Sequence, residues 1–309
     1  MRTTLFSIAA LSALTLLATA CSQDEPAGTA ASAATSALTV ESVAIASGEP
    51  ATRAAVLPTP VTSGTIMVGV RDGNGYKAQG PLAYTYSGGK WTCSAADIKV
   101  GFNAASLYGY ILGGHSENAD GTIGMTTRDY ADTTDLLYAT SGGENVCATH
   151  PYAGFVLKHA YARVKVNLTL DSSLPAATHS TLDAVSLDAT GLYASASLKP
   201  DDDTLVVGTP LSQPLWSPNA AITSLAGRKF TGDKLVVPAA TLSDAKLTVT
   251  VSGTRWPVDL STALTALQMG KIYTINVTLK KYSLLITKVE VEEWTDGGTH
   301  NSDMEIQGD

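Results

Sequence analysis

The chain has 309 residues, of which 44% are hydrophobic, and its 28 acidic and 20 basic side chains give a formal net charge of −8. A chain this acidic has no basic field to attract phosphate, so the composition argues against nucleic acid as a partner. After the first residues, no stretch is apolar enough to span a bilayer.

The first 20 residues have the pattern of a bacterial lipoprotein signal peptide. Arg2 supplies a positive start, an apolar run interrupted only by Ser and Thr extends from Leu5 to Ala20, and Cys21 follows directly. The run is shorter than the roughly 20 residues of a membrane-spanning helix, and small residues precede the cysteine as a signal peptidase requires. We therefore expect cleavage before Cys21 and attachment of lipid, palmitate included, to its thiol. The alternative is an ordinary signal peptide cut near Ala20, and residue 18 is Ala where lipoprotein signals usually have Leu.

The next segment predicts a tether and then a strand. Residues 21–37 are mostly Ala, Ser and Thr, a composition that cannot bury enough apolar surface to order the chain. Leu38 to Ala46 alternates apolar and polar side chains around one irregular step at Glu41-Ser42, which is typical of a half-buried strand. A hydrophilic spacer with Arg53 and Ala54 follows. The sequence thus predicts a strand directly upstream of an exposed, proteolysis-prone arginine.

The remaining chain predicts an all-β fold, because no later segment sustains a helical apolar stripe over three turns. Residues 113–145 are polar and predict long loops over one short strand at residues 136–139. Roughly seven strands precede residue 153 and seven or eight follow it, which two β-sandwiches explain better than one large barrel. We therefore expect an N-terminal β-sandwich at residues 38–152 and a C-terminal one at residues 153–309.

The strongest strand pattern covers residues 155–170. From Ala160 onward the apolar side chains share one parity, whereas Phe155 and Leu157 lie on the other, so the phase changes near Lys158-His159. A one-residue slip would move the whole apolar set to the opposite face of a sheet. The pattern therefore predicts a bulge or a crossing between sheets at this point, with His159 half-buried and bonded to backbone.

Few residues indicate chemistry. Cys93 and Cys147 remain after the leader cysteine, and in an exported protein a disulfide between them and two buried thiols are about equally compatible with the sequence. Asp201-Asp202-Asp203 predicts a hairpin tip, since consecutive carboxylates point in different directions, and His115 is expected to be a solvated loop residue. The sequence has no nucleophile elbow, zinc-site spacing or Gly-rich phosphate loop, so we expect no catalysis, metal or cofactor.

Several stretches together resemble the fimbrillin family of Bacteroidetes pilins. They are the leader with Cys21, the segment Thr52-Arg53-Ala54, the run from Phe155 to Val166, and a distal module made of Lys234 to Pro238, Leu247 to Val251, Gly270 to Tyr273 and Val289 to Trp294. Their order and spacing cover most of the mature chain, while the region from about residue 60 to 150 matches less clearly.

The resemblance implies two tandem transthyretin-like β-sandwich domains and assembly by strand exchange. In such pilins the lipid carries the precursor to the outer membrane, and an arginine-specific protease then removes the first strand, here residues 38–53 with the cut after Arg53. The groove left behind accepts a strand from a neighbouring subunit, and a head-to-tail contact that does not close produces a filament. The family's donor lies in an extended C-terminal segment, here residues 283–306 with Val289, Val291 and Trp294 on one face. The alternative for this segment is an ordinary edge strand.

The resemblance favours a structural pilin, shaft or tip/adaptor, that serves adhesion. Its partners would be other pilin subunits, the outer membrane through the lipid before maturation, and a host or bacterial surface receptor; its location would be the outer membrane and then the fimbrium. The alternative is a monomeric cell-surface lipoprotein that binds glycan, with Trp91, Trp216 or Trp256 stacking on sugar.

Overall fold

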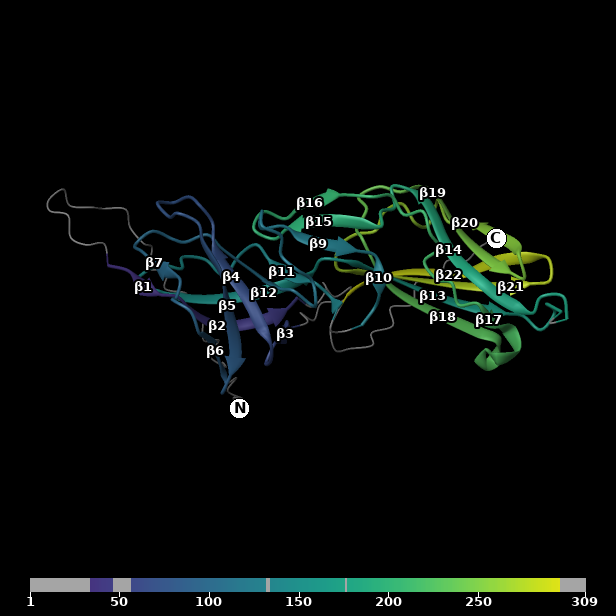
Figure 1. Cartoon of the computed structure of the whole chain (residues 1–309), viewed down its shortest axis with the longest axis horizontal. Helices are drawn as coiled ribbons and strands as arrows, with labels where there is room; N and C mark the ends of the chain where they lie inside the picture. Colours follow the sequence, from purple (N-terminus) through teal and green to yellow (C-terminus); the bar gives the residue numbers. More distant parts are fainter. Residues whose placement is uncertain (1–33, 47–56, 132–133, 176, 295–309) are drawn as a thin grey trace, which may run out of the picture.

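A computed structural model describes residues 34–46, 57–131, 134–175 and 177–294. Its regular structure is built of strands, interrupted only by short 3-10 segments such as η2 (Ile222–Ser224) and η3 (Ala226–Arg228), so the predicted all-β fold is confirmed. The molecule is elongated, with an N-terminal lobe at one end and a C-terminal lobe at the other (Figure 1). No helix in the described ranges has the length and apolarity to cross a membrane.

The N-terminal lobe is a curled eight-stranded sheet. In spatial order its strands are β3 (Thr59–Pro60), β2 (Thr39–Ile45), β12 (Tyr152–His159), β11 (Leu137–Ala139), β8 (Leu107–Ile111), β4 (Thr65–Val70), β5 (Gln79–Ser87) and β6 (Lys90–Cys93). The curl brings β2 into contact with β6, near the opposite end of the strand order. A two-stranded ribbon of β1 (Ser36–Ala37) and β7 (Lys99–Val100) lies beside it. Apolar side chains from alternate positions of these strands fill the space inside the curl.

The C-terminal lobe is a sandwich of two sheets. One contains β10 (Arg128–Asp129), β18 (Lys229–Val236), β13 (Ala162–Leu170), β21 (Lys271–Lys280) and β22 (Ser283–Glu293); the other contains β17 (Ala220–Ala221), β14 (Thr181–Thr190), β19 (Ser243–Val251) and β20 (Thr254–Asp259). A single apolar cluster draws on both sheets, for example through Val164 and Val185, which are fully buried. Polar residues occupy the other face of β13, where Arg163 pairs with Asp233 of β18 at 2.7 Å.

A third sheet and a third apolar cluster join the lobes. The sheet consists of β16 (Thr204–Val207), β15 (Ser195–Lys199) and β9 (Ile123–Thr126), and it lies between the lobes in Figure 1. The cluster contains Tyr110 and Tyr138 of the N-terminal sheet, Leu235 and Ile272 of the C-terminal sheet, and Trp294. Strands β9 and β10 precede residue 152 yet pair with β15 and β18, which follow it. The two lobes therefore share strands and a packed core.

The predicted sheet crossing is confirmed. Strand β12 belongs to the eight-stranded sheet and β13 to the five-stranded sheet, and Ala160 and Tyr161 between them are fully buried. The expected boundary between residues 152 and 153 falls at the start of β12, whereas the chain changes sheets only after His159. Because each sheet buries one parity of its strands, the apolar phase has to change where the chain moves from one sheet to the other.

Candidate functional site: the first strand and its groove

Strand β2 is held between two neighbours. It runs parallel to β12, with Val43 opposite Phe155 and Ile45 opposite Leu157, and antiparallel to β3. Two further backbone bonds extend the pairing with the β12 side: Thr39 N–H donates to Pro151 O at 2.8 Å and Ala46 N–H to Leu157 O at 2.7 Å. This strand is therefore integrated into the backbone ladder of the N-terminal lobe.

Three side chains of the first segment enter the core of this lobe. Leu38, Val40 and Val43 are 2–3% exposed. Between the last two, Glu41 and Ser42 are both exposed, and the pairing with β12 shifts register at this point. The additional residue returns Val43 to the buried face, as expected for a bulge. The predicted half-buried strand with one irregular step is thus confirmed.

Phe155 of β12 fills the space behind β2. Its side chain is 1% exposed and packs where two glycines leave room for the ring. A Cβ added to Gly142 would lie 2.7 Å from Phe155 Cζ, and one added to Gly109 would lie 3.1 Å from its Cδ1. Because neither glycine has a side chain, the aromatic ring of Phe155 fits into the interior of the lobe. A larger residue at either position would reduce the space for this ring.

The residues that precede β2 are also held in place by hydrogen bonds. Strand β1 pairs with β7, Leu38 N–H donates to Ile98 O at 2.9 Å, and Ser36 Oγ donates to Ala148 O at 2.7 Å. The end of β2 and the start of β3 are register partners, Ile45 with Thr59. The spacer with Arg53 and Ala54 therefore connects two adjacent strands at one end of the sheet; these two residues and Cys21 lie outside the described ranges.

The expected donor segment forms the edge strand β22 of the C-terminal sheet in this structure. Val289 pairs with Ile275 of β21 and is half-buried against the core, while Val291 pairs with Tyr273 and is 47% exposed. Trp294 follows the strand and is 3% exposed, so in the folded chain it does not share an open face with the two valines. The donor residues after 294 lie outside the described ranges.

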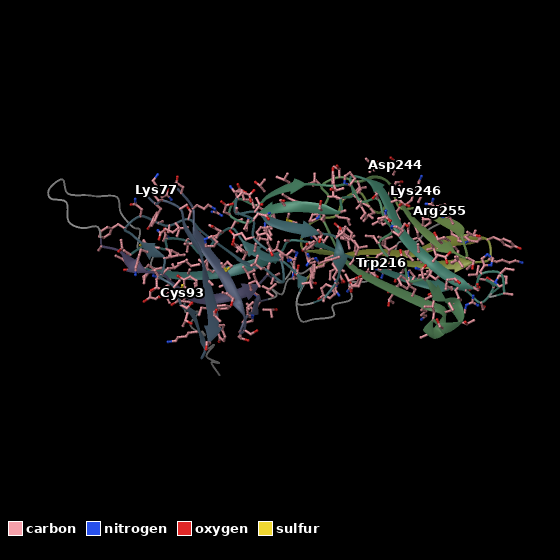
Figure 2. The ribbon with its side chains drawn as sticks, viewed as in Figure 1. Lys77, Cys93, Trp216, Asp244, Lys246 and Arg255 are labelled. Carbon is pink, nitrogen blue, oxygen red and sulfur yellow. The ribbon has the colours of Figure 1, made fainter. Side chains whose placement is uncertain are left out.

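The sequence left open whether Cys93 and Cys147 form a disulfide or remain thiols, and in this structure both are thiols. Cys93 ends β6 and is half-buried, whereas Cys147 is buried in the loop before β12, with Thr149 Oγ1 at 3.2 Å from its Sγ. Figure 2 places Cys93 in the N-terminal lobe. The disulfide between Cys93 and Cys147 is therefore not formed in this structure.

The tryptophans proposed to stack on sugar are part of the packing. Trp91 is 6% and Trp216 is 7% exposed. Trp216, labelled in Figure 2, covers Gly232, where an added Cβ would lie 2.4 Å from the indole. Trp256 is half-buried against the C-terminal core. The buried indoles of Trp91 and Trp216 do not offer the open face that sugar stacking requires.

The triple aspartate does form a hairpin tip, between β15 and β16, as predicted. Lys199 lies 3.5 Å from a carboxylate oxygen of Asp201 and 3.1 Å from one of Asp202. Asp203 instead accepts hydrogen bonds from Lys158, at 2.6 Å, and from Tyr138, both in the N-terminal sheet. The tip therefore connects the lobes, and within the described residues no group of three His, Cys, Asp or Glu side chains is arranged to hold a metal.

The fold defines a class of protein: an elongated, two-lobed β-sandwich protein whose strand β2 pairs with β12 and contributes buried side chains to the N-terminal lobe. The model of the fimbrillin-like family matches residues 72–294, and the chain belongs to this family. Membership supports a pilin or adhesion role in a surface-exposed fimbrium, in a family of structural proteins. No curated protein matches the chain.

Two solved structures with TM-scores above 0.5 share the fold. A candidate cell adhesion protein from Bacteroides uniformis has 19% identity and a TM-score of 0.57, covering 85% of this chain and 100% of that one. A candidate cell adhesion protein from Bacteroides ovatus has 16% identity and a TM-score of 0.53, covering 85% and 99%. A fimbrial protein from Bacteroides vulgatus is more distant, with 13% identity, a TM-score of 0.45 and coverage of 75% and 92%. At these identities the similarity concerns the fold alone.

Proposed function

We propose that this chain is a fimbrial subunit that polymerises by strand exchange at the groove now filled by β2. The observation that carries the proposal is the position of β2: it supplies three buried side chains to the lobe, and the spacer that follows it contains Arg53. One cut in that spacer separates the strand covalently from everything after it. The segment from Ser36 to Ala46 is then held only by noncovalent contacts.

The energetics favour replacement of this strand over its simple loss. Burial of each of Leu38, Val40 and Val43 contributes roughly 1.5–3 kcal/mol. The sum is comparable with the total stability of a typical domain, about 5–15 kcal/mol. An empty groove would also leave the backbone of β12 unpaired between Tyr152 and Leu157. A strand from a neighbouring subunit would restore both the buried apolar side chains and the backbone pairing of β12 by β-augmentation. Its backbone hydrogen bonds would set the register, and its apolar side chains would occupy the positions left by Leu38, Val40 and Val43.

In this proposal the leader and the groove act in sequence. Lipid on Cys21 directs the precursor to the outer membrane, and β2 occupies the groove until cleavage after Arg53. The occupied groove prevents premature polymerisation, because an incoming strand has no unpaired edge of β12 to join. After cleavage the partners are other pilin subunits, the product is a fimbrium on the cell surface, and adhesion follows from contact with a host or bacterial receptor.

Trimming of the precursor tests the proposal. An arginine-specific protease is expected to cut the purified precursor after Arg53 and to produce a ladder of multimers in unheated detergent gels. Arg53→Ala should remain uncut at this position and monomeric. Arg255→Ala, which alters an exposed arginine of β20, is the matched control and should behave like the wild type. A trimmed protein that stays monomeric at high concentration would refute strand exchange.

Lipidation is tested separately. Radiolabelled palmitate is expected to label the wild-type chain in cells and not a Cys21→Ser variant, and only the labelled chain should fractionate with the outer membrane before trimming. Labelling that persists in Cys21→Ser would show that the lipid is attached to a residue other than Cys21.

A further inference from the structure

A pocket of about 540 Å³ opens between the lobes, away from the β2 groove. Its walls come from the loop between β8 and β9, from β9 and β10, and from the hairpin of β15 and β16. The volume lies in the range of small-molecule sites in proteins, about 300–1,000 Å³. The hairpin of β15 and β16 is far from the other two walls in the sequence, so only the tertiary fold forms this pocket.

One wall is a buried, neutral polar network. His115 is 7% exposed; its Nδ1 lies 2.7 Å from Leu112 O and its Nε2 lies 2.8 Å from the hydroxyl of Tyr161. Burial, together with the positive charge of Arg128, lowers the pKa of His115, so the ring is neutral. Nδ1–H then donates to Leu112 O, and Nε2 accepts from Tyr161. His115 therefore contributes a fixed ring and no charge.

Arg128 of β10 is the charged side chain of the pocket lining. Its Nη2 donates to Thr126 Oγ1 at 3.3 Å, and no carboxylate in the described part of the chain forms an ion pair with it. The neighbouring acids have other partners: Glu117 accepts from Tyr110, and Asp129 pairs with Lys234 at 2.8 Å. In a chain with a net charge of −8, the pocket is therefore lined by a half-buried arginine that forms no ion pair with any described residue. Its guanidinium offers the planar fork that binds carboxylates in a bidentate manner.

The wall formed by β15 and β16 combines hydroxyl and apolar groups. Ser195 Oγ accepts from Thr209 N–H at 3.0 Å, which leaves the hydroxyl hydrogen available as a donor. Val206 of β16 is 62% exposed, and as the register partner of Ser197 it lies on the same face of the hairpin as Ser195. A small inorganic anion could use the arginine but would leave these groups uncovered. A ligand with a carboxylate, hydroxyls and one apolar face would engage every wall.

We propose that this pocket binds an acidic sugar, with the sugar carboxylate on Arg128, its hydroxyls on the Ser195 side and its C–H face against Val206. The site shares no residue with the β2 groove, so it does not depend on strand exchange. In a fimbrial subunit, this pocket would recognise receptor glycans that carry a uronic or nonulosonic acid.

The test is calorimetric titration of the full chain with the methyl glycosides of D-galacturonate and N-acetylneuraminate, compared with methyl galactoside and sodium acetate. At least one acidic glycoside is expected to bind saturably, and methyl galactoside and acetate at least about tenfold more weakly, because each lacks part of the contact set. Absence of binding by both acidic glycosides would overturn the proposal. Acetate binding as tightly as the sugars would also overturn it, since the site would then recognise a carboxylate and not a sugar.

Variants locate the site. Arg128→Gln is expected to weaken acidic-sugar binding at least about tenfold, whereas Arg255→Gln, which alters a surface arginine in the C-terminal lobe (Figure 2), should leave it unchanged. Val206→Glu places an acid on an exposed pocket position beside Ser197 and should weaken binding too, even if Arg128→Gln proves unstable in a thermal melt. Acidic-sugar affinity that is unchanged in folded Arg128→Gln, or in Val206→Glu, would place the binding elsewhere and refute the assignment.

Discussion

The indole of Trp294 lies flat on the imidazole of His159, with ring centroids 4.0 Å apart and planes 5° from parallel. His159 ends β12, which forms one wall of the β2 groove, and Trp294 follows the C-terminal strand β22. Asp135 is hydrogen-bonded to His159 Nδ1, and the ring of Tyr130 meets the indole edge-on, with centroids 5.7 Å apart. The end of the C-terminal strand is thus packed against the groove-forming sheet.

Trp294→Ala is expected to destabilise the protein by about 3–5 kcal/mol, because it removes a buried aromatic side chain and leaves a cavity at the junction of the lobes. Urea unfolding followed by circular dichroism measures the change. Val291→Ala, which truncates a half-exposed residue of the preceding strand, is the control and should cost less than about 1 kcal/mol. Similar losses for both variants would contradict a structural role of the indole.

Val43→Asp is expected to destabilise the precursor by about 3–5 kcal/mol, since it places a carboxylate among the apolar side chains that line the groove. Its spacer should also be cut faster by an arginine-specific protease, because β2 would leave the groove more often. The control is Glu41→Ala on the exposed side of the same strand. If the two variants unfold at the same urea concentration and are cut at the same rate, β2 is not an important part of the core.

Gly142→Ala should cost about 1–3 kcal/mol, because the added methyl group would meet the ring of Phe155 at 2.7 Å in a packed interior. Gly124 of β9 is the matched control, since a Cβ there has no neighbour within 4 Å. Gly124→Ala should be neutral or stabilise the chain by up to about 1 kcal/mol, through the smaller backbone entropy of its unfolded state. Thermal melts of both variants provide the comparison, and equal melting temperatures would contradict it.

Acid should weaken the pocket wall at His115. Burial lowers the pKa of this imidazole below its unfolded value of about 6.5, so the unfolded chain binds the proton more readily. The stability that neutral His115 contributes is present above about pH 6.5 and is lost as the pH falls towards the folded pKa. His115→Gln keeps an acceptor for Tyr161 and cannot take up the proton, so its stability should decline less between pH 7 and pH 5.

NMR titration of the histidine ring protons checks this directly. The His115 signal is expected to titrate below the unfolded-state pKa of about 6.5, because burial lowers the pKa of this imidazole. A His115 midpoint at or above that value would contradict the neutral, buried state.

Period-two patterns could be interpreted from the sequence because they record which side of a strand is buried. The step at Glu41-Ser42 and the phase change before Ala160 each marked a real feature, a shifted register and a change of sheet. Strand β11 at Leu137–Ala139 also lies where the short strand was expected. In each case the alternation of side chains along the strand was sufficient to predict the feature, since this alternation does not depend on which strand is the partner.

Other expectations failed where the partner is distant in sequence. The polar stretch of residues 113–145 also contains β9 and β10, which are too short to show a pattern and form only against β15 and β18. His115 is buried and not solvated, because Tyr161 supplies its partner. His159 is buried against a carboxylate and not bonded to backbone alone. These environments are set by residues between 24 and more than 100 positions away.

The sequence by itself determined that this chain is all-β, where its principal strands begin, and that a half-buried strand precedes a spacer that contains an arginine. Only the tertiary structure decided that β2 pairs in parallel with β12, that Trp294 stacks on His159, and that Arg128 lines a pocket and forms no ion pair with another described residue. The physical reason is that alternation is a local property of the backbone, whereas pairing and charge compensation depend on contacts that folding alone brings together.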